Sequence, residues 1–215
     1  MLIISSKSIK TAYVDILGRL ISDAQKYDDP ELSREDFAIV QIQDHQEWKP
    51  LITYELGILN EPFPYTEYFP FITQERIDQE IHYWNQQFFV ANKLPELVQY
   101  LHDFPLSKRA IILFWEDKYR DLSKGAVCEI AAFFRIKNKQ LEMHTHMRAN
   151  NAVFLLFMDM RILMGVQRLI AKELNVKLGD YIHVIDSLHI YEAEADSART
   201  QLEFMSTSSL WKQLL

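Results

Sequence analysis

Cysteine is almost absent from this sequence, with Cys128 the only one among 215 residues, and an internal disulfide is therefore excluded. Basic charge is also scarce. The net charge of −7 argues against a nucleic-acid partner, because such proteins usually carry a basic excess. The most apolar stretch, residues 152–165, is interrupted by Asp159 and Arg161, so it predicts a core helix and not a membrane span. Residues 1–7 lack the apolar run of a signal peptide, and we expect a cytoplasmic protein.

Hydrophobic periodicity predicts both helices and strands, with no internal repeat, low-complexity segment or linker. We therefore expect one α+β domain over residues 1–215, with a mixed, buried β-sheet flanked by helices. The predicted helices cover residues 8–24, 95–102 and 151–174, and the predicted strands cover 37–42, 110–115, 127–136, 141–148 and 181–190. Residues 110–115 are apolar throughout, which is typical of a strand buried on both faces.

Local signals connect these elements. The strands 127–136 and 141–148 form a predicted hairpin across residues 137–139. Asn150 or Asn151 is the predicted N-cap of the long helix, and Gly179 ends the turn before the last strand. Three prolines between positions 62 and 70 predict an irregular loop, because each fixes φ and removes a backbone donor.

The candidate nucleophile is Cys128. A lone cysteine on an apolar strand is most often a small buried hydrophobic residue. A catalytic thiolate needs a positive charge or a hydrogen-bond donor nearby. The predicted hairpin brings Arg148 back toward Cys128, because its two strands run antiparallel. These residues alone leave both interpretations of Cys128 open.

Three segments of the chain resemble the thymidylate synthase family, which includes hydroxymethylases of cytidine nucleotides. They are residues 128–134 (CEIAAFF), 148–154 (RANNAVF) and 186–191 (DSLHIY). The resemblance implies the family fold, with the sheets of two subunits packed back to back in a homodimer. It also implies that Cys128 attacks C6 of a pyrimidine nucleotide, and that 5,10-methylenetetrahydrofolate donates a one-carbon unit to C5.

The resemblance assigns further residues to the nucleotide phosphate and to proton transfer. Arg148 becomes a phosphate ligand within its own subunit. Lys108 and Arg109 precede the predicted strand 110–115, and they become phosphate ligands in the partner's site. A guanidinium group suits a phosphate dianion because it donates paired, charge-assisted hydrogen bonds. Glu55, read on an apolar helix, matches the glutamate that organises water in the pocket.

Asp159 matches the position that reads the edge of the pyrimidine base, where thymidylate synthases carry asparagine. An ionised carboxylate only accepts hydrogen bonds, whereas an amide also donates. Cytosine offers an amino donor at N4, and its N3 can carry a shared proton. A mismatched buried polar edge costs several kcal/mol, a discrimination on the order of 10⁴-fold. Asp159 therefore predicts a cytidine nucleotide, CMP or dCMP, and the resemblance to the family's hydroxymethylases implies a 5-hydroxymethylated product.

The sugar is assigned to His189 and Tyr191, which share one face of a strand at spacing i, i+2. Ala149 stands where the family commonly has serine, which leaves room for a ribose 2′-hydroxyl. His144 and His146 share the same spacing and could bind zinc, but no third ligand is apparent, and we expect no metal.

Other residues depart from the family pattern and leave two alternatives open. Val127 and Glu129 flank Cys128 where proline and histidine are usual, and Asn151 replaces an aspartate that contacts the folate. The first alternative is a divergent thymidylate synthase that acts on dUMP. The second is a catalytically silent homologue that only binds a nucleotide.

Overall fold

A six-stranded mixed sheet forms the centre of the computed structural model, which describes residues 1–22, 32–43, 53–55, 58–60, 64–69, 71–90, 92–121, 123 and 126–212. The strand order is β1-β2-β8-β7-β6-β5. Two neighbouring pairs, β1 with β2 and β7 with β8, are parallel, and the others are antiparallel. The strands are β1 (Leu2–Ser6), β2 (Leu32–Ile42), β5 (Ile111–Leu113), β6 (Glu129–Lys137), β7 (Gln140–Asn151) and β8 (Lys177–Tyr191), while β3 (Thr53–Glu55) and β4 (Ile58–Asn60) pair with each other.

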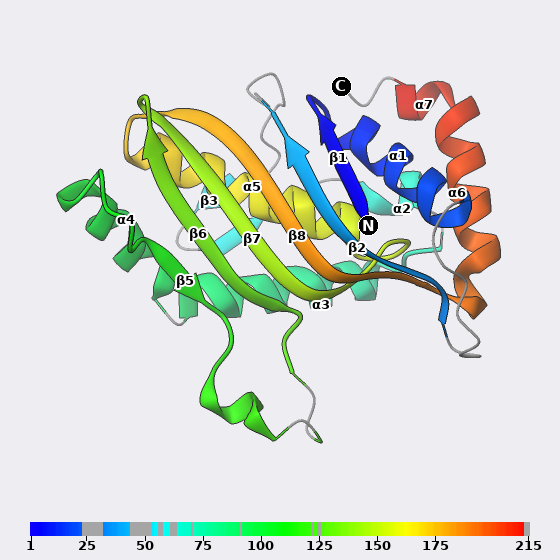
Figure 1. The fold of residues 1–215 in the computed structure, drawn as a ribbon, viewed down its shortest axis with the longest axis horizontal. Coiled ribbons are helices and arrows are strands. Elements are labelled where there is room, and N and C mark those ends of the chain that lie inside the picture. The colour runs from blue at the N-terminus through cyan, green and yellow to red at the C-terminus, as the bar shows by residue number, and fades with distance from the viewer. Residues whose placement is uncertain are drawn as a thin grey trace.

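The main helices lie on one face of this sheet (Figure 1). The helices are α1 (Ile9–Ser22), α2 (Tyr65–Tyr68), α3 (Gln74–Asn85), α4 (Lys93–Asp103), α5 (Leu156–Glu173), α6 (Ala195–Thr207) and α7 (Ser209–Lys212), with a π-helical turn at Gln86–Val90. The helix α5 runs behind β7 and β8, and every residue from Leu156 to Gln167 is buried. The hydroxyl of Tyr13 in α1 donates to the carbonyl of Ala152 at 2.9 Å, which ties α1 to the turn before α5.

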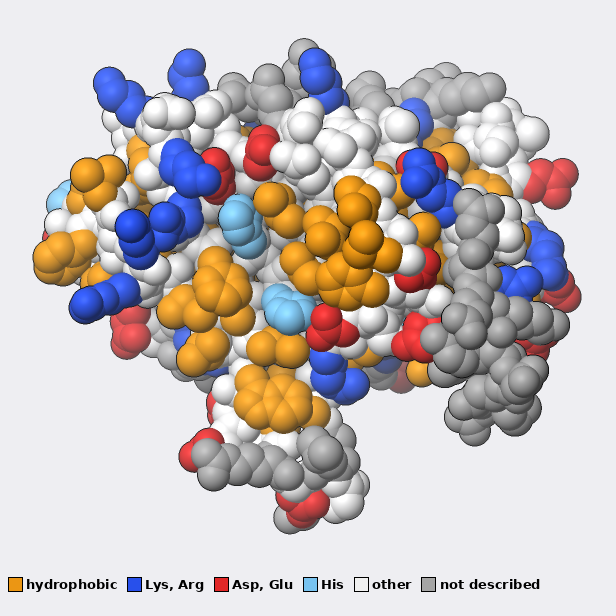
Figure 2. All heavy atoms as spheres, in the orientation of Figure 1, with side chains coloured by type: hydrophobic (Ala, Val, Ile, Leu, Met, Phe, Trp, Pro, Cys, Tyr) orange, Lys and Arg blue, Asp and Glu red, His pale blue; other side chains and the backbone are white. Residues whose placement is uncertain are grey.

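The opposite face of the sheet carries exposed apolar side chains. Ile111 and Leu113 of β5 and Phe133 of β6 are 37%, 55% and 43% exposed. Figure 2 looks onto this face and shows hydrophobic side chains gathered over it, with histidines among them. A monomer rarely leaves a large apolar surface to water, so this face is a candidate surface for a further layer.

Most predicted elements are present. The helix predicted at 8–24 is α1, with residues 23 and 24 outside the described ranges, and the helix at 95–102 lies within α4. The hairpin of β6 and β7 turns at Asn138 and Lys139, both of which have positive φ. The strands predicted at 37–42 and 181–190 lie within β2 and β8.

Other expectations are wrong in detail. The segment predicted as a strand buried on both faces is the edge strand β5, where only Ile112 of three residues is buried. Gly179 lies inside β8 and not in a turn before it. The proline-rich stretch contains the one-turn helix α2, and Glu55, read on a helix, belongs to strand β3.

The long helix also begins later than predicted, because residues 152–155 form turns. The side-chain oxygen of Asn151 accepts hydrogen bonds from the backbone N–H groups of Val153 and Phe154, at 3.0 and 2.8 Å. Asn151 therefore stabilises the turn that precedes α5, as asparagine commonly does, and does not cap the helix itself.

Candidate active site

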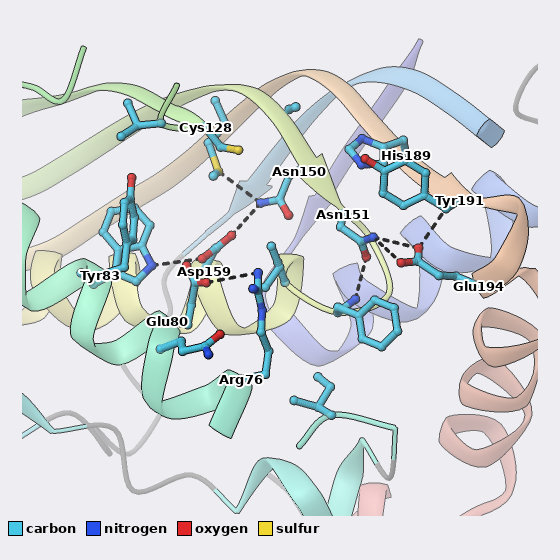
Figure 3. A pocket seen from close by; sticks show the side chains of 18 of the residues that line it. Arg76, Glu80, Tyr83, Cys128, Asn150, Asn151, Asp159, His189, Tyr191 and Glu194 are labelled. Atoms are coloured by element: carbon cyan, nitrogen blue, oxygen red, sulfur yellow. Dashed lines mark hydrogen bonds and ion pairs between the residues drawn. The ribbon is translucent and has the colours of Figure 1, made fainter. Parts of the chain in front are cut away.

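A cavity of about 800 Å³ opens where β7, the N-terminal end of α5 and the helix α3 meet. Figure 3 shows that its labelled side chains come from opposite sides and converge on one space. Six of the nine predicted site residues line it, namely Cys128, Arg148, Ala149, Asp159, His189 and Tyr191. The fold thus gathers residues that lie more than sixty positions apart in the sequence.

Cys128 lies directly before β6, and Arg148 of β7 holds it in place. The backbone N–H of Arg148 donates to the Cys128 carbonyl at 2.9 Å. The guanidinium group donates to the carbonyls of Val127 and Ala126 at 3.0 and 2.9 Å, and it lies 3.9 Å from the Cys128 sulfur. The hairpin therefore fixes both the thiol and the cation that the sequence predicted beside it.

Burial raises the pKa of the Cys128 thiol above its usual value. The positive charge of Arg148 opposes this effect, whereas the negative charges of Asp159, Glu80 and Glu129 add to it. The free protein therefore holds this group mainly as a thiol at neutral pH. A nucleophilic attack requires that the thiol lose its proton, so proton-accepting groups nearby become important.

Asp159, at the start of α5, is 1% exposed and lies at the floor of the cavity. The indole N–H of Trp84 donates to one carboxyl oxygen at 3.1 Å, and the Asn150 amide donates to the other at 3.0 Å. Burial and the charge of Glu80 raise the pKa of Asp159 well above its ordinary value. This shift favours the protonated form of Asp159 in the free protein, whereas the sequence argument treats the side chain as an ionised acceptor.

Glu80 of α3 is the second acid at this floor, and burial raises its pKa as well. Arg76 lies one helical turn earlier, with a guanidinium nitrogen 3.7 Å from the Glu80 carboxyl, and it favours the ionised form. Glu80 and Asp159 thus lie close enough to share a proton, with Arg76 placing the negative charge on Glu80 (Figure 3).

A third acid, Glu129, follows Cys128 and is fully buried behind the cavity wall. A backbone hydrogen bond from His146 favours its ionised form. Burial raises its pKa well above the ordinary value, and the charge of Asp159 raises it further. Glu129 therefore retains its proton to a higher pH than a solvated glutamate does.

The opposite end of the cavity is formed by β8 and the turn after it. The rings of His189 and Tyr191 meet edge to face, with centroids 4.8 Å apart, so the predicted sugar contacts do share one face. The amide nitrogen of Asn151 donates to both carboxyl oxygens of Glu194, at 2.9 and 2.8 Å. Glu194 thereby brings a carboxylate into the cavity wall beside the sugar contacts.

Two predicted site residues do not join this cluster. Lys108 and Arg109 are exposed before β5, and Arg109 lines a different cavity with Lys93 and Tyr100. The side chain of Glu55 lies outside the described part of the structure.

The sequence argument missed Glu80, Tyr83, Trp84 and Asn150. Residues 80–84 (EIHYW) carry the signal that predicts Glu80, Tyr83 and Trp84, because the two aromatic residues follow the glutamate at helical spacing. The sequence argument treats Asn150 only as a helix cap, although its position between Arg148 and Asp159 indicates proximity to both.

The described ranges contain no candidate metal cluster and no candidate membrane-spanning helix. No cluster of three His, Cys, Asp or Glu side chains there is placed to hold an ion. None of the helices there has the length and hydrophobicity that a bilayer-spanning helix requires.

Comparison with known proteins agrees with this geometry. The family model described as thymidylate synthase matches residues 71–210, which include every described element of the candidate site. The chain therefore belongs to the thymidylate synthase family. That family uses methylenetetrahydrofolate as its one-carbon donor.

Similar proteins include the bifunctional dihydrofolate reductase-thymidylate synthase of Paramecium tetraurelia, at 26% identity over 53% of this chain and 24% of that protein. The thymidylate synthase of Mycoplasma pneumoniae is 24% identical over 52% of this chain and 39% of that protein. The thymidylate synthase of Streptococcus pyogenes is 22% identical over 63% of this chain and 56% of that protein. The chain thus spans between about a quarter and a little over half of these relatives.

A solved structure supports the same fold. The thermostable thymidylate synthase A of Bacillus subtilis superimposes with a TM-score of 0.61, over 91% of this chain and 84% of that chain, at 17% identity. The predicted α+β architecture, with a mixed sheet flanked by helices, is confirmed.

Proposed function

We propose that this protein transfers a one-carbon unit from 5,10-methylenetetrahydrofolate to C5 of a pyrimidine nucleoside monophosphate. The observation that carries the proposal is the placement of Cys128 and Arg148 at one cavity whose floor is the carboxyl group of Asp159. The thiol supplies a nucleophile, the guanidinium group supplies charge for a phosphate, and the carboxyl groups supply and accept protons.

The chemistry begins at C6 of the bound base. The Cys128 thiol gives its proton to a carboxylate of the site as its sulfur forms a bond to C6, and the electron pair of the C5–C6 double bond shifts away from C6 and makes C5 nucleophilic. Electron density also builds up on N3 and on the substituent at C4. A proton held between Asp159 and Glu80 can neutralise this negative charge, since both acids have a raised pKa and lie at the cavity floor. We therefore assign proton transfer to Glu80, in place of Glu55.

The residues opposite this floor fit a folate. The amide of Asn151 is already engaged by Glu194 and by the turn before α5, so it does not replace the lost aspartate. Glu194 instead presents a carboxylate at that wall, and Phe71 and Phe154 add an apolar surface, with ring centroids 5.5 Å apart. These residues would hold the folate, which supplies the one-carbon unit when bound.

The base that best suits this site is cytosine, which makes CMP or dCMP the preferred substrate and 5-hydroxymethyl-CMP or -dCMP the preferred product. A protonated Asp159 can donate to N3 of cytosine and accept from its N4 amino group. The alternative substrate is dUMP, because a protonated carboxyl group can also pair with uracil. Ala149 leaves space beside the sugar, which favours a ribose, and His189 and Tyr191 supply the sugar contacts.

We also propose a homodimer formed through the exposed sheet face that carries Ile111, Leu113 and Phe133. The apolar side chains on this face would become buried in such a dimer. Lys108 and Arg109 lie before the edge strand and do not line the cavity of their own chain. Their charges are therefore available to the phosphate in the partner's site.

Hydrogen exchange at C5 tests the covalent step without folate. The protein is incubated with CMP, dCMP or dUMP tritiated at C5, and release of tritium to water is measured alongside nucleotide binding. We expect release with the wild type and none with Cys128→Ser, which should still bind the nucleotide. Binding by the wild type without any release would instead identify a silent homologue.

A further inference from the structure

The Asn150 side chain has a fixed orientation at the cavity floor. Asn150 lies near the end of β7, is 2% exposed and is held by the main-chain ladder between β7 and β8. Its amide nitrogen donates to Asp159 at 3.0 Å and to the sulfur of Met147 at 3.1 Å. Both amide hydrogens are therefore used, which determines which end of the amide faces Asp159.

The amide oxygen of Asn150 is left without a hydrogen-bond partner among the described residues. Figure 3 shows the nitrogen turned toward Asp159 and the oxygen on the side away from it. Buried carbonyl oxygens nearly always accept a hydrogen bond, and one without a donor destabilises the protein. Since Asn150 also lines the cavity, a ligand donor is the simplest partner for this oxygen.

We propose that the Asn150 side-chain oxygen is a second acceptor for the N4 amino group of cytosine, beside Asp159, and that it makes Asn150 a specificity-determining residue. The proposal rests on the proposed function, since it assumes that a pyrimidine base lies against the cavity floor. An exocyclic amino group carries two N–H donors. Asp159 accepts from one of them, and Asn150 accepts from the other.

This second acceptor supplies a discrimination that Asp159 alone does not. A protonated Asp159 can both donate and accept, so it pairs with either base. An amide oxygen whose nitrogen is committed to Asp159 and Met147 can only accept. Uracil places the acceptor O4 where cytosine has its amino group, so Asn150 would face it with a second acceptor. The preference for cytosine then persists whatever the protonation state of Asp159.

The test compares nucleotides that differ in the group at C4 of the base. Dissociation constants are measured by calorimetry for CMP, for the nucleotide of pyrimidin-2-one, which has hydrogen in its place, and for UMP. We expect the wild type to prefer CMP over the pyrimidin-2-one nucleotide, and Asn150→Leu to reduce that preference about tenfold. UMP should bind more tightly to Asn150→Leu than to the wild type, because the acceptor facing O4 is gone.

Trp84→Phe is the matched control, because it removes the other N–H donor to Asp159 but offers no acceptor to the base. If Asn150 reads the amino group directly, Trp84→Phe keeps most of the preference for CMP. An equal loss in both variants would overturn the proposal, since Asn150 would then act only through Asp159. Thermal unfolding of each variant verifies folding, and Asn150→Ala replaces Asn150→Leu if the larger side chain is not accommodated.

Failure of this proposal is distinguishable from failure of the proposed function. If the wild type prefers CMP and Asp159→Asn removes the preference while Asn150→Leu keeps it, only the role of Asn150 is overturned. If the wild type shows no preference for the amino group, the cytosine assignment and the role of Asn150 both fall. Tritium release from dUMP would still support the covalent chemistry.

Discussion

Arg148 is bonded to both sides of Cys128, by its backbone N–H to the carbonyl of Cys128 and by its guanidinium group to the two carbonyls that precede it. The same guanidinium group lies 3.9 Å from the sulfur. The arginine therefore shapes the loop that carries the thiol, and its positive charge also lowers the thiol pKa.

The first prediction is that Arg148→Ala slows alkylation of Cys128 at neutral pH by about tenfold, because the pKa of an already buried thiol rises further. The rate of iodoacetamide modification is measured from pH 6 to pH 10 in the absence of nucleotide. Arg199→Ala is the control, since it removes one positive charge from an exposed residue of α6. Equal profiles for wild type and Arg148→Ala would contradict an electrostatic role.

The second prediction separates two glutamates. We expect Glu80→Gln to lower kcat by at least about 10²-fold, because proton transfer by a positioned acid contributes that much, and Glu55→Gln to have little effect. Turnover of CMP or dCMP with methylenetetrahydrofolate is the measurement, and nucleotide binding provides the check on folding. A strong loss in Glu55→Gln alone would restore the original assignment.

The difference between these glutamates shows what the sequence could predict about the site. Cys128, Arg148 and Asp159 were predictable because they match the family in one continuous stretch, in which a hairpin and the helix after it set the spacing. Glu80 belongs to α3, and only tertiary packing brings that helix against β7 and α5. A Glu-Leu pair in an apolar segment, as at Glu55, carries too little information to identify a residue in space.

The fold shows a similar division. The α1 periodicity and the β6–β7 hairpin were predictable because local hydrophobic pattern and turn position determine them. The exposure of Ile111 and Leu113 was not, because an apolar run has the same sequence on a sheet edge as in a sheet centre. The start of α5 was also missed, since the Asn151 side chain stabilises a turn where the apolar pattern already continues.

The third prediction concerns the base. Asp159→Asn should reduce the preference for cytidine over uridine nucleotides or reverse it, because an amide nitrogen at this position cannot accept from Asn150, whose side chain is then free to turn and offer a donor to O4 of uracil. The change is expected to be at least about tenfold in kcat/KM, measured for CMP, dCMP and dUMP with both proteins. A wild type that prefers dUMP would instead support thymidylate synthesis.

The fourth prediction tests sites shared between subunits. Arg109→Ala and Arg148→Ala should each be nearly inactive as pure proteins, because each loses a phosphate ligand. In a mixed dimer, one site combines the intact Arg148 of one chain with the intact Arg109 of the other, and the second site lacks both arginines. Mixing after subunit exchange should therefore recover about a quarter of the wild-type activity, as expected when half of all dimers hold one intact site of two. Absence of recovery after verified exchange would argue against shared sites.

The fifth prediction concerns His183, which is fully buried in β8 and accepts or shares a hydrogen bond with the Tyr181 hydroxyl at 2.9 Å. Burial lowers its pKa to about 3, against 6.5 for an unperturbed histidine, and the charge of His146 contributes to the same shift. Below pH 6.5 the unfolded chain therefore binds a proton at this position that the folded protein does not bind until about pH 3.

Stability must consequently fall with decreasing pH across this window, by up to about 1.4 kcal/mol per pH unit from His183 alone. Between pH 6.5 and about pH 5 the loss is about 2 kcal/mol. The variant His183→Phe should unfold with a flatter dependence on pH in urea titrations, even if its stability at neutral pH is lower. His102→Gln, in an exposed position of α4, should keep the wild-type slope. The buried acids Glu129 and Asp159 are present in all three proteins, so a difference in the slope of unfolding free energy against pH is due to His183. Equal slopes for His183→Phe and wild type would contradict the lowered pKa of His183.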